Sequence, residues 1–154
     1  ALPILTPSQD PHTLANQAAQ AMWSRDQAAQ GLGMQLVSVS PGRATLRMGV
    51  RADMVNGHHI CHGGLIFTLA DTAFAYACNS YNQNTVASGC NIDFLAPARE
   101  GQTLEAVAIE RSAAGRTGVY DVEVRVVDGG AVALFRGKSY RIKGEVIAGF
   151  EQET

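Results

Sequence analysis

The sequence predicts an α+β domain in which a curled antiparallel sheet of about six strands wraps round one long central helix, with a further helix at the N-terminus. Two observations support this prediction. Residues 63–80 have helical spacing and are apolar on nearly every side, so that helix must be buried. Six strand-like runs joined by short turns also occur, and such strands pair antiparallel. A single helix buried by such a sheet requires the sheet to curl.

The chain before the first strand is predicted to form an arm and a helix. Residues 1–11 contain three prolines and no periodicity, which predicts a flexible arm. Apolar residues recur at helical spacing from His12 to about Gln30, and glycines follow the end of that stretch. We therefore expect one helix over residues 12–30.

Alternating apolar and polar residues, separated by turn sequences, mark the strands. The turn Asp128-Gly129-Gly130 is typical of a hairpin. The chain has 154 residues, which fits one domain, placed here at 12–143 and followed by a tail over 144–154. The predicted strands lie at 36–39, 44–50, 85–95, 103–111, 117–127 and 131–142.

Composition excludes several classes of function. The formal net charge of −2 gives no electrostatic basis for binding nucleic acid or an anionic membrane surface. No apolar run approaches the roughly 20 residues of a transmembrane helix, and no secretory signal is visible. The three cysteines have irregular spacing and do not resemble a disulfide framework. We therefore expect a cytoplasmic protein without a nucleic-acid or membrane partner.

Asp71 needs an explanation because it lies in the middle of the apolar helix. A carboxylate among apolar side chains is costly unless it is paired or used. One interpretation makes Asp71 a catalytic base or nucleophile. The other places it on the one wet face of the helix, beside Thr68 and Thr72.

The loop before this helix favours the catalytic interpretation. It ends in His62-Gly63-Gly64, so two glycines would open the helix. The first N–H groups of a helix have no partner within it and lie at the positive end of its dipole, so they suit a developing oxyanion. His62 and Asn56 would add donors or orient a substrate carbonyl. Alternatively, the glycines only allow tight packing of the helix start.

Spacing decides which site Asp71 is able to serve. Gly63 and Asp71 are eight residues apart in the sequence. That is about 12 Å along a helix that rises ~1.5 Å per residue. A base or nucleophile must come within roughly 3 Å of its target, directly or through one water. Asp71 would therefore serve the site of an antiparallel helix in a second subunit, which predicts a dimer with composite active sites.

Metal-binding side chains also occur in the loop. His58, His59, Cys61 and His62 are possible zinc ligands, but their spacing matches no common zinc pattern. We expect no metal, and interpret these residues as polar loop residues near a pocket.

Two cations share one face of a late strand. Arg136 and Lys138 are two residues apart, so their side chains point the same way from a strand. Together they would bind the phosphates of a nucleotide-bearing carrier. Alternatively, they protect a solvated edge strand from pairing with other chains.

The same residues carry a resemblance to a known family. The segments Asn56-Gly57, Cys61-His62-Gly63-Gly64 and Leu69-Ala70-Asp71-Thr72-Ala73 closely resemble the phenylacetic acid degradation thioesterases, which are hotdog-fold acyl-CoA hydrolases. The resemblance covers roughly residues 20–143. It implies a hotdog fold, dimers paired into tetramers, an acyl-CoA substrate and no cofactor.

The resemblance also implies roles for individual residues. Asp71 is expected to be the catalytic nucleophile or general base, and the Gly63 amide to polarise the thioester carbonyl. Asn56, His62 and Thr72 are expected to line the site, with Asp71 and Thr72 supplied by the neighbouring subunit. The implied reaction is hydrolysis of phenylacetyl-CoA and its ring-hydroxylated relatives during aerobic phenylacetate breakdown.

Two alternative functions stay open at this point. An acyl-CoA hydratase or dehydratase would have the same fold, and such enzymes usually need a His–Asp pair on one substrate. A non-catalytic acyl-CoA binding protein would bind CoA esters without releasing thiol. Fold alone does not choose between them, whereas the placement of Asp71 and Gly63 favours hydrolysis.

Overall fold

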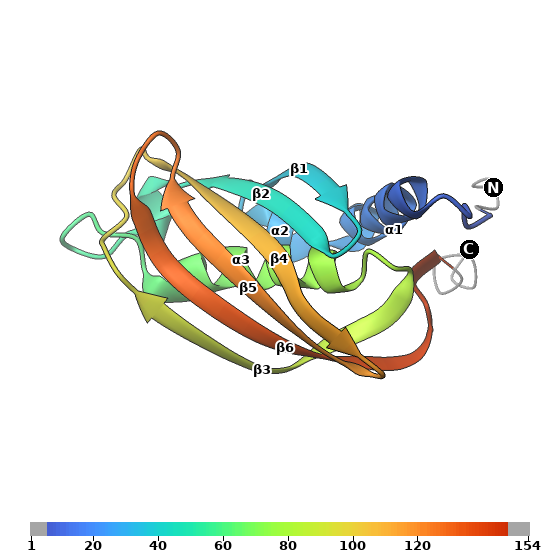
Figure 1. The fold of residues 1–154 in the computed structure, drawn as a ribbon. Helices are drawn as coiled ribbons and strands as arrows, with labels where there is room; N and C mark the ends of the chain where they lie inside the picture. Colours follow the sequence, from blue (N-terminus) through green and yellow to red (C-terminus); the bar gives the residue numbers. More distant parts are fainter. Residues whose placement is uncertain (1–5, 148–154) are drawn as a thin grey trace.

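A computed structural model describes residues 6–147 of the chain. Its main feature is an antiparallel sheet that curls round helix α3 (Gly63–Cys78) (Figure 1). The described residues form a six-stranded sheet in the order β1-β2-β4-β5-β6-β3, with antiparallel neighbours throughout. This arrangement confirms the predicted hotdog fold. The strands are β1 (Gln35–Ser40), β2 (Arg43–Gly49), β3 (Gln83–Phe94), β4 (Thr103–Ala114), β5 (Thr117–Val126) and β6 (Ala131–Glu145), and a short 3-10 helix, η1, spans Ala52–Met54.

Helix α3 is buried because apolar side chains cover nearly all of its surface. Leu69 and Ala70 are completely buried, and the ring of Phe74 packs against β6 where Gly137 has no side chain. A Cβ atom at Gly137 would come within 2.8 Å of that ring. Although α3 is apolar, no helix within residues 6–147 is both long and apolar enough to cross a membrane.

Strand β3 forms one free edge of the sheet. Its register with β6 pairs Cys90 with Gly137 and Ile92 with Phe135. Directly opposite residues of an antiparallel pair share a face, so Cys90 and Ile92 point toward α3. Most of β3 is exposed, and its outer backbone groups are available to pair with another chain.

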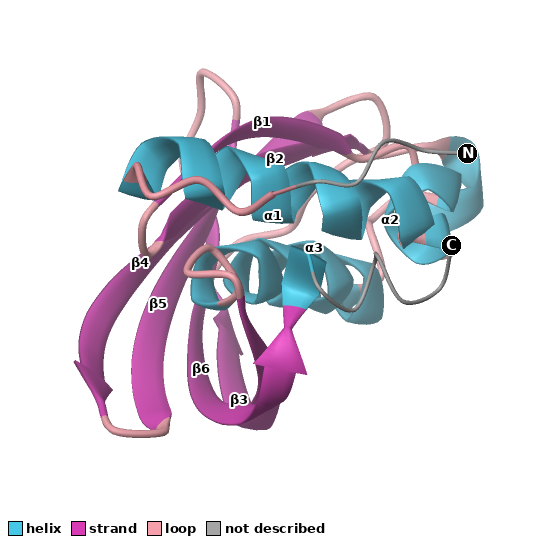
Figure 2. Ribbon diagram, turned by 90° about the vertical axis from the view of Figure 1, so that its right-hand side faces the viewer, coloured by secondary structure: helices cyan, strands magenta, loops and turns pink. Residues whose placement is uncertain are grey.

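The N-terminal region forms two helices, so the prediction of one helix over 12–30 is wrong. Helices α1 (Pro11–Arg25) and α2 (Gln27–Gly31) are separated at Asp26, whose carboxylate accepts a hydrogen bond from the Ala29 amide and caps α2. The same carboxylate accepts a 3.1 Å hydrogen bond from the Tyr76 hydroxyl of α3. Helix α1 thereby lies along α3, on the side opposite β6 and β3 (Figure 2).

The predicted strand boundaries agree with the structure to within three residues. The largest differences are at the C-terminal ends of β4 and β6. Strand β6 reaches Glu145, inside the segment predicted as a tail, and Ile147 is buried with its amide donating to the Asn82 side chain. Helix α1 begins at Pro11, inside the predicted arm. The rest of the arm and tail predictions fall partly on residues 1–5 and 148–154, outside the described residues.

Candidate active site

The N-terminus of α3 presents unpaired amides. His62 is the N-cap, with φ −59° and ψ 135°, and its carbonyl accepts hydrogen bonds from the amides of Leu65 and Ile66. The amides of Gly63 and Gly64 donate to no acceptor among residues 6–147. Two adjacent free N–H groups at the positive end of a helix dipole are suited to bind a polarised carbonyl or an oxyanion.

An apolar groove of about 420 Å³ lies at this end of α3. The ring of Phe94 covers Gly63 so closely that a Cβ atom there would come within 2.9 Å of it. Phe94 and Leu95 are 53% and 54% exposed in the single chain. Sequence alone assigns Phe94 no role, because nothing in a strand-ending aromatic residue signals which helix end it will cover.

The loop before α3 brings Asn56 alongside the residues that lead into the helix. Val55 and Cys61 form an isolated antiparallel bridge. The Asn56 side-chain oxygen accepts hydrogen bonds from the amides of His58 and Ile60, at 2.9 and 3.2 Å. The carboxamide oxygen of Asn56 therefore tightens the loop. The His62 side chain makes no capping hydrogen bond within the described part of the chain and is exposed.

Asp71 is half-buried on α3, and burial raises the pKa of its carboxyl above the ordinary value. No N–H or O–H group of residues 6–147 donates to this carboxylate. The neighbouring Thr72 hydroxyl instead donates to the Thr68 carbonyl, at 2.6 Å. A fully wet helix face, the alternative interpretation, would not desolvate the carboxylate in this way. Asp71 is thus an unpaired acid in a partly apolar environment.

The structure does not bring Asp71 and Gly63 together within one chain. Both lie on the same unbroken helix. Their separation of eight residues corresponds to about 12 Å along the helix axis. A carbonyl held by the Gly63 amide is therefore beyond the reach of the Asp71 of its own chain.

The cysteines are free, and their environments do not suit nucleophiles or metal ligands. Cys61 and Cys78 are buried, and burial raises the pKa of Cys78 to about 12. Cys90 is partly exposed on β3, and burial together with the nearby charge of Asp71 raises the pKa of its thiol. Over residues 6–147, no three His, Cys, Asp or Glu side chains are grouped closely enough to bind a metal ion.

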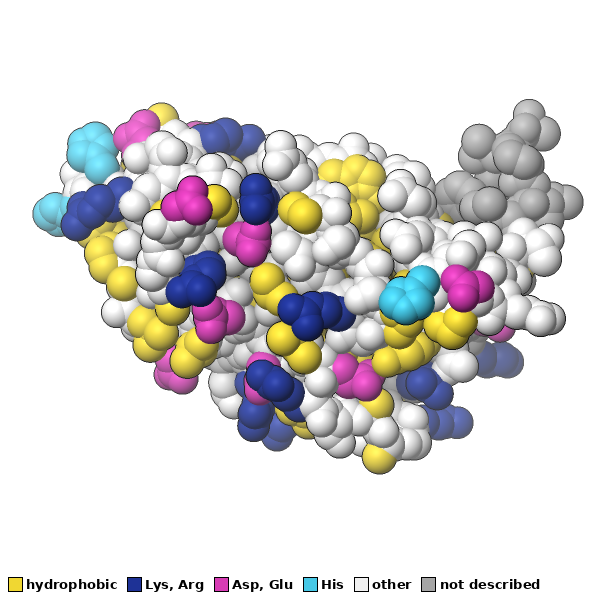
Figure 3. Space-filling view, turned by 45° about the horizontal axis from the view of Figure 1, so that its top comes forward, with side chains coloured by type: hydrophobic (Ala, Val, Ile, Leu, Met, Phe, Trp, Pro, Cys, Tyr) yellow, Lys and Arg dark blue, Asp and Glu magenta, His cyan; other side chains and the backbone are white. Residues whose placement is uncertain are grey.

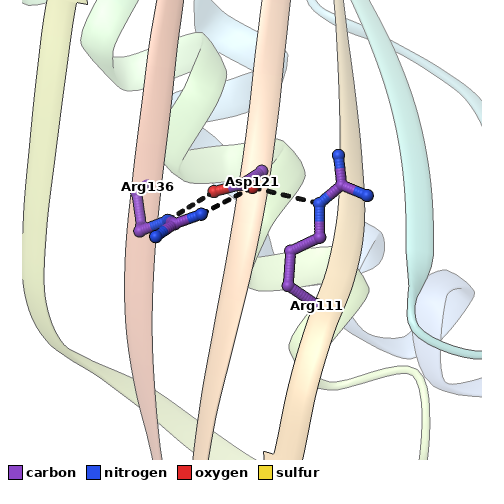
Figure 4. Close-up of polar contacts among 3 residues, drawn as sticks. All are labelled: Arg111, Asp121 and Arg136. Atoms are coloured by element: carbon purple, nitrogen blue, oxygen red, sulfur yellow. Dashed lines mark hydrogen bonds and ion pairs between the residues drawn. The ribbon is translucent and has the colours of Figure 1, made fainter.

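Arg136 and Lys138 lie on the outer face of the sheet, whereas α3 lies on the inner face. Arg136 donates two hydrogen bonds to Asp121, at 2.7 and 2.9 Å, and Arg111 donates a third to the same carboxylate, at 3.0 Å (Figure 4). These contacts hold the pKa of Asp121 below its ordinary value. Both predicted phosphate-binding residues are thus remote from Gly63 in this chain. The edge-strand alternative is wrong, because β6 lies between β5 and β3.

The family is identified by comparison with known proteins. The sequence profile described as the Thioesterase superfamily matches residues 58–133, from the loop before α3 to the start of β6. The chain belongs to this family and is a hydrolase acting on thioester bonds. The family predicted from the segments between Asn56 and Ala73 is thereby confirmed.

Individual relatives show which members of the family the chain resembles. The chain is 52% identical over 130 residues to the acyl-coenzyme A thioesterase PaaI of Escherichia coli, covering 84% of this chain and 93% of the relative. The solved structure of the E. coli PaaI protein from the phenylacetic acid degradation operon has a TM-score of 0.87, with 50% identity over 88% of this chain and 99% of that one. A Streptococcus mutans protein solved bound to acetyl CoA has a TM-score of 0.69 and 25% identity, covering 73% of this chain and 90% of that one.

Proposed function

We propose that the protein hydrolyses phenylacetyl-CoA and ring-hydroxylated phenylacetyl-CoA esters to the free acid and CoA, in aerobic phenylacetate catabolism. Two features of α3 carry the proposal: the amides of Gly63 and Gly64 and the carboxylate of Asp71, none of which has a hydrogen-bond partner among residues 6–147. The E. coli relative is named an acyl-coenzyme A thioesterase, and its solved structure is that of a protein from the phenylacetic acid degradation operon. These names support the substrate class and the pathway.

In the proposed reaction, the Gly63 amide donates a hydrogen bond to the thioester oxygen and stabilises the oxyanion that forms there. Asp71 of the partner subunit either attacks the carbonyl carbon or takes a proton from the water that attacks it. Attack by Asp71 breaks the C–S bond, releases CoA thiolate and leaves a mixed anhydride, which water then hydrolyses. The remaining site residues orient or line the substrate: Asn56, His62, Gly64 and Thr72.

The proposed site requires a dimer, and the free edge at β3 suits one. Pairing of β3 with its symmetry copy would extend the sheet and set two α3 helices side by side in opposite directions. Each Gly63 would then face Asp71 of the partner subunit. Phe94, Leu95 and Val86 are large, exposed and apolar along or beside β3, so a second copy would remove apolar surface from water.

The outer face of the sheet supports pairing of two such dimers. It holds a cavity of about 600 Å³, larger than the groove at the α3 N-terminus. Acidic and basic side chains alternate across this side of the molecule, with apolar ones between them (Figure 3). Four acidic and three basic side chains line the cavity, so it is nearly neutral and suits a second copy of itself. The charged residues are Asp93, Glu105, Asp121, Glu123, Arg111, Arg125 and Arg136.

We further propose Arg136 and Lys138 as contacts for the CoA phosphates at the rim of this face. Both side chains are exposed on β6. The charge of Arg136 is shared with Asp121, whereas Lys138 has no ion-pair partner within residues 6–147. Lys138 therefore offers the larger share of available positive charge. The three free thiols support the cytoplasm as the proposed compartment.

A thiol-release assay tests the proposed function. Wild-type protein is assayed with phenylacetyl-CoA, a ring-hydroxylated phenylacetyl-CoA, benzoyl-CoA and straight-chain acyl-CoA esters. We expect the aryl-acetyl esters to be the best substrates, and Asp71→Asn to lower their turnover by at least about 100-fold. Binding of CoA esters without thiol release would instead identify a binding protein. Hydration of an enoyl-CoA in place of hydrolysis would identify a hydratase.

The choice between nucleophile and base has its own test. A single turnover in heavy-oxygen water transfers the label to the Asp71 carboxylate if the carboxylate attacks and water then cleaves the anhydride at that carbon. Label in the Asp71 carboxylate therefore rules out simple base catalysis and identifies Asp71 as the nucleophile.

A further inference from the structure

The stripe of α3 that carries Asp71 lies beside the edge strand β3, and we name the surface between these two elements the notch. Phe67, Asp71 and Phe74 follow one another at spacings of four and three residues, so they lie on one side of the helix. Phe67 and Phe74 both pack on Phe135 of β6, with ring centroids 5.4 and 5.9 Å apart. Asp71 therefore lies between two aromatic contacts, on the side of α3 that meets β6 and β3.

Cys90 and Ile92 of β3 form the opposite wall. Cys90 is paired with Gly137, against which Phe74 packs, and Ile92 is paired with Phe135. The two β3 residues therefore lie beside the segment of α3 between Phe67 and Phe74, which contains Asp71. Both are only partly buried, so they keep exposed apolar surface facing the notch.

A β-bulge in β3 lies just before Cys90. A register shift between Ala87 and Gly89 inserts Ser88 as an extra residue just before Cys90. Such bulges re-aim the side chains that follow them. Burial raises the pKa of the Cys90 thiol, and the charge of Asp71 contributes to the same shift.

The distance over which Asp71 is able to act determines which part of the substrate lies in the notch. If Asp71 of one subunit serves the thioester held by its partner, the attacked carbon lies within roughly 3 Å of the carboxylate or of one water bound to it. The acyl chain begins at that carbon, so it must run along the surfaces on either side of Asp71. In the chain that supplies Asp71, those surfaces are the half-buried ring of Phe67 and the side chains of Cys90 and Ile92.

We propose that Phe67, Cys90 and Ile92 form the acyl-group wall of the composite site, and that the side chain at position 90 sets the size of acyl group that reaches Asp71. This inference rests on the proposed thioesterase function. An aromatic acyl group fits because a ring beside Phe67 packs at the 4.5–7 Å separation that aromatic pairs prefer. The short side chain of Cys90 covers less of this surface than a leucine side chain would, so position 90 limits the size of the ring that lies beside Phe67.

Substitution at position 90 tests the size limit. Cys90→Leu adds apolar volume inside the notch, and we expect it to lower kcat/KM for phenylacetyl-CoA at least about tenfold relative to kcat/KM for acetyl-CoA. The matched control is Asn91→Leu, which introduces the same side chain on the next residue of β3, where it points to the opposite face. Asn91→Leu is expected to keep the wild-type ratio of the two values.

Alkylation of Cys90 provides a second measurement that does not depend on the folding of Cys90→Leu. In native Asp71→Asn protein, N-ethylmaleimide should modify Cys90 before the buried Cys61 and Cys78, and peptide mapping by mass spectrometry locates the label. Saturating phenylacetyl-CoA should slow modification of Cys90, whereas CoA alone should not, because only the ester places an acyl group in the notch.

The outcomes separate this inference from the proposed function. Wild-type protein that releases no thiol from any acyl-CoA refutes the proposed function itself. Active wild-type protein overturns only the acyl-wall assignment if Cys90→Leu keeps the wild-type substrate ratio, or if phenylacetyl-CoA and CoA alone protect Cys90 equally. A shifted ratio together with ester-specific protection supports the assignment.

Discussion

Two inactive variants should restore activity to each other if the site is divided between subunits. The first variant is Gly63→Pro, which removes the amide proposed to bind the oxyanion. Gly63 is the first residue of α3, a position that accepts proline, and His62 already has ψ 135°, which suits the residue before a proline. Loss of one oxyanion donor costs about 3 kcal/mol, or roughly 10²- to 10³-fold in kcat.

Gly63→Ala is the matched control for the proline variant. Both substitutions place a Cβ atom at the point 2.9 Å from the Phe94 ring, so both displace that ring. Only proline removes the N–H group. The ratio of kcat between Gly63→Ala and Gly63→Pro therefore measures the contribution of the amide to the rate. We expect the proline variant to be slower by roughly 10²- to 10³-fold.

The second variant is Asp71→Asn, and the magnitude of recovery follows from the geometry. The two residues are about 12 Å apart on one helix, so each chain contributes them to different sites. A hybrid dimer pairs Gly63 of one chain with Asp71 of the other and has one intact site out of two. Equal random mixing makes half of all dimers hybrid, which predicts about one quarter of the wild-type activity.

The assay is CoA release from phenylacetyl-CoA after the two variants are unfolded, mixed and refolded together, with each carrying a different affinity tag. Dimers that carry both tags, separated from tetramers before the second affinity step, are hybrids and should show about half of the wild-type activity per dimer. The composite site is refuted if verified hybrids are no more active than either parent. Hybrids of Asp71→Asn with wild-type chains set the value expected for one working site.

Three further predictions concern stability and assembly. Because burial raises the pKa of Asp71, its ionisation favours the unfolded chain. Urea unfolding should therefore show wild type losing stability relative to Asp71→Asn as pH rises through the raised pKa, and a pH-independent difference would contradict this. Gly137→Ala places a Cβ atom 2.8 Å from the Phe74 ring and should cost about 1–3 kcal/mol in urea unfolding, whereas Gly89→Ala, with no atom within 4 Å, should not. Asp121→Asn removes the carboxylate that holds Arg111 and Arg136 in place on the outer face, and sedimentation should show the proposed tetramers shifted toward dimers with the fold retained. An unchanged sedimentation profile would argue against this interface.

The fold was largely predictable because its main elements follow local rules. Strand β5 alternates buried Tyr120, Val122 and Val124 with outward polar residues, and no tertiary contact is needed to read that pattern. The break at Asp26 was not predictable in the same way. Apolar periodicity continues through it, and the residue caps α2 while also binding Tyr76, which is far away in the sequence.

The residues of the candidate site likewise form two groups: some are recognisable in the sequence, and others only in the tertiary structure. Gly63 and Asp71 stand out in the sequence because a glycine pair at a helix start and a carboxylate in an apolar helix are each unusual locally. Phe94 and Cys90 do not stand out, since their positions depend on how β3 crosses α3 and on its register with β6. The contacts of Arg136 likewise required the register that places it beside Asp121.

In the proposed dimer, assembly and catalysis depend on the same contact. Among residues 6–147 of one chain, α3 carries a partly desolvated carboxylate without a donor, which is unfavourable, and two amides without a protein acceptor. An antiparallel partner helix brings the positive end of its dipole toward Asp71, which favours the ionised form that the reaction needs. The juxtaposition that relieves the cost of a buried charge is therefore also the one that assembles the site. A subunit interface weakened enough to release monomers should abolish turnover even though each monomer still carries every proposed catalytic group.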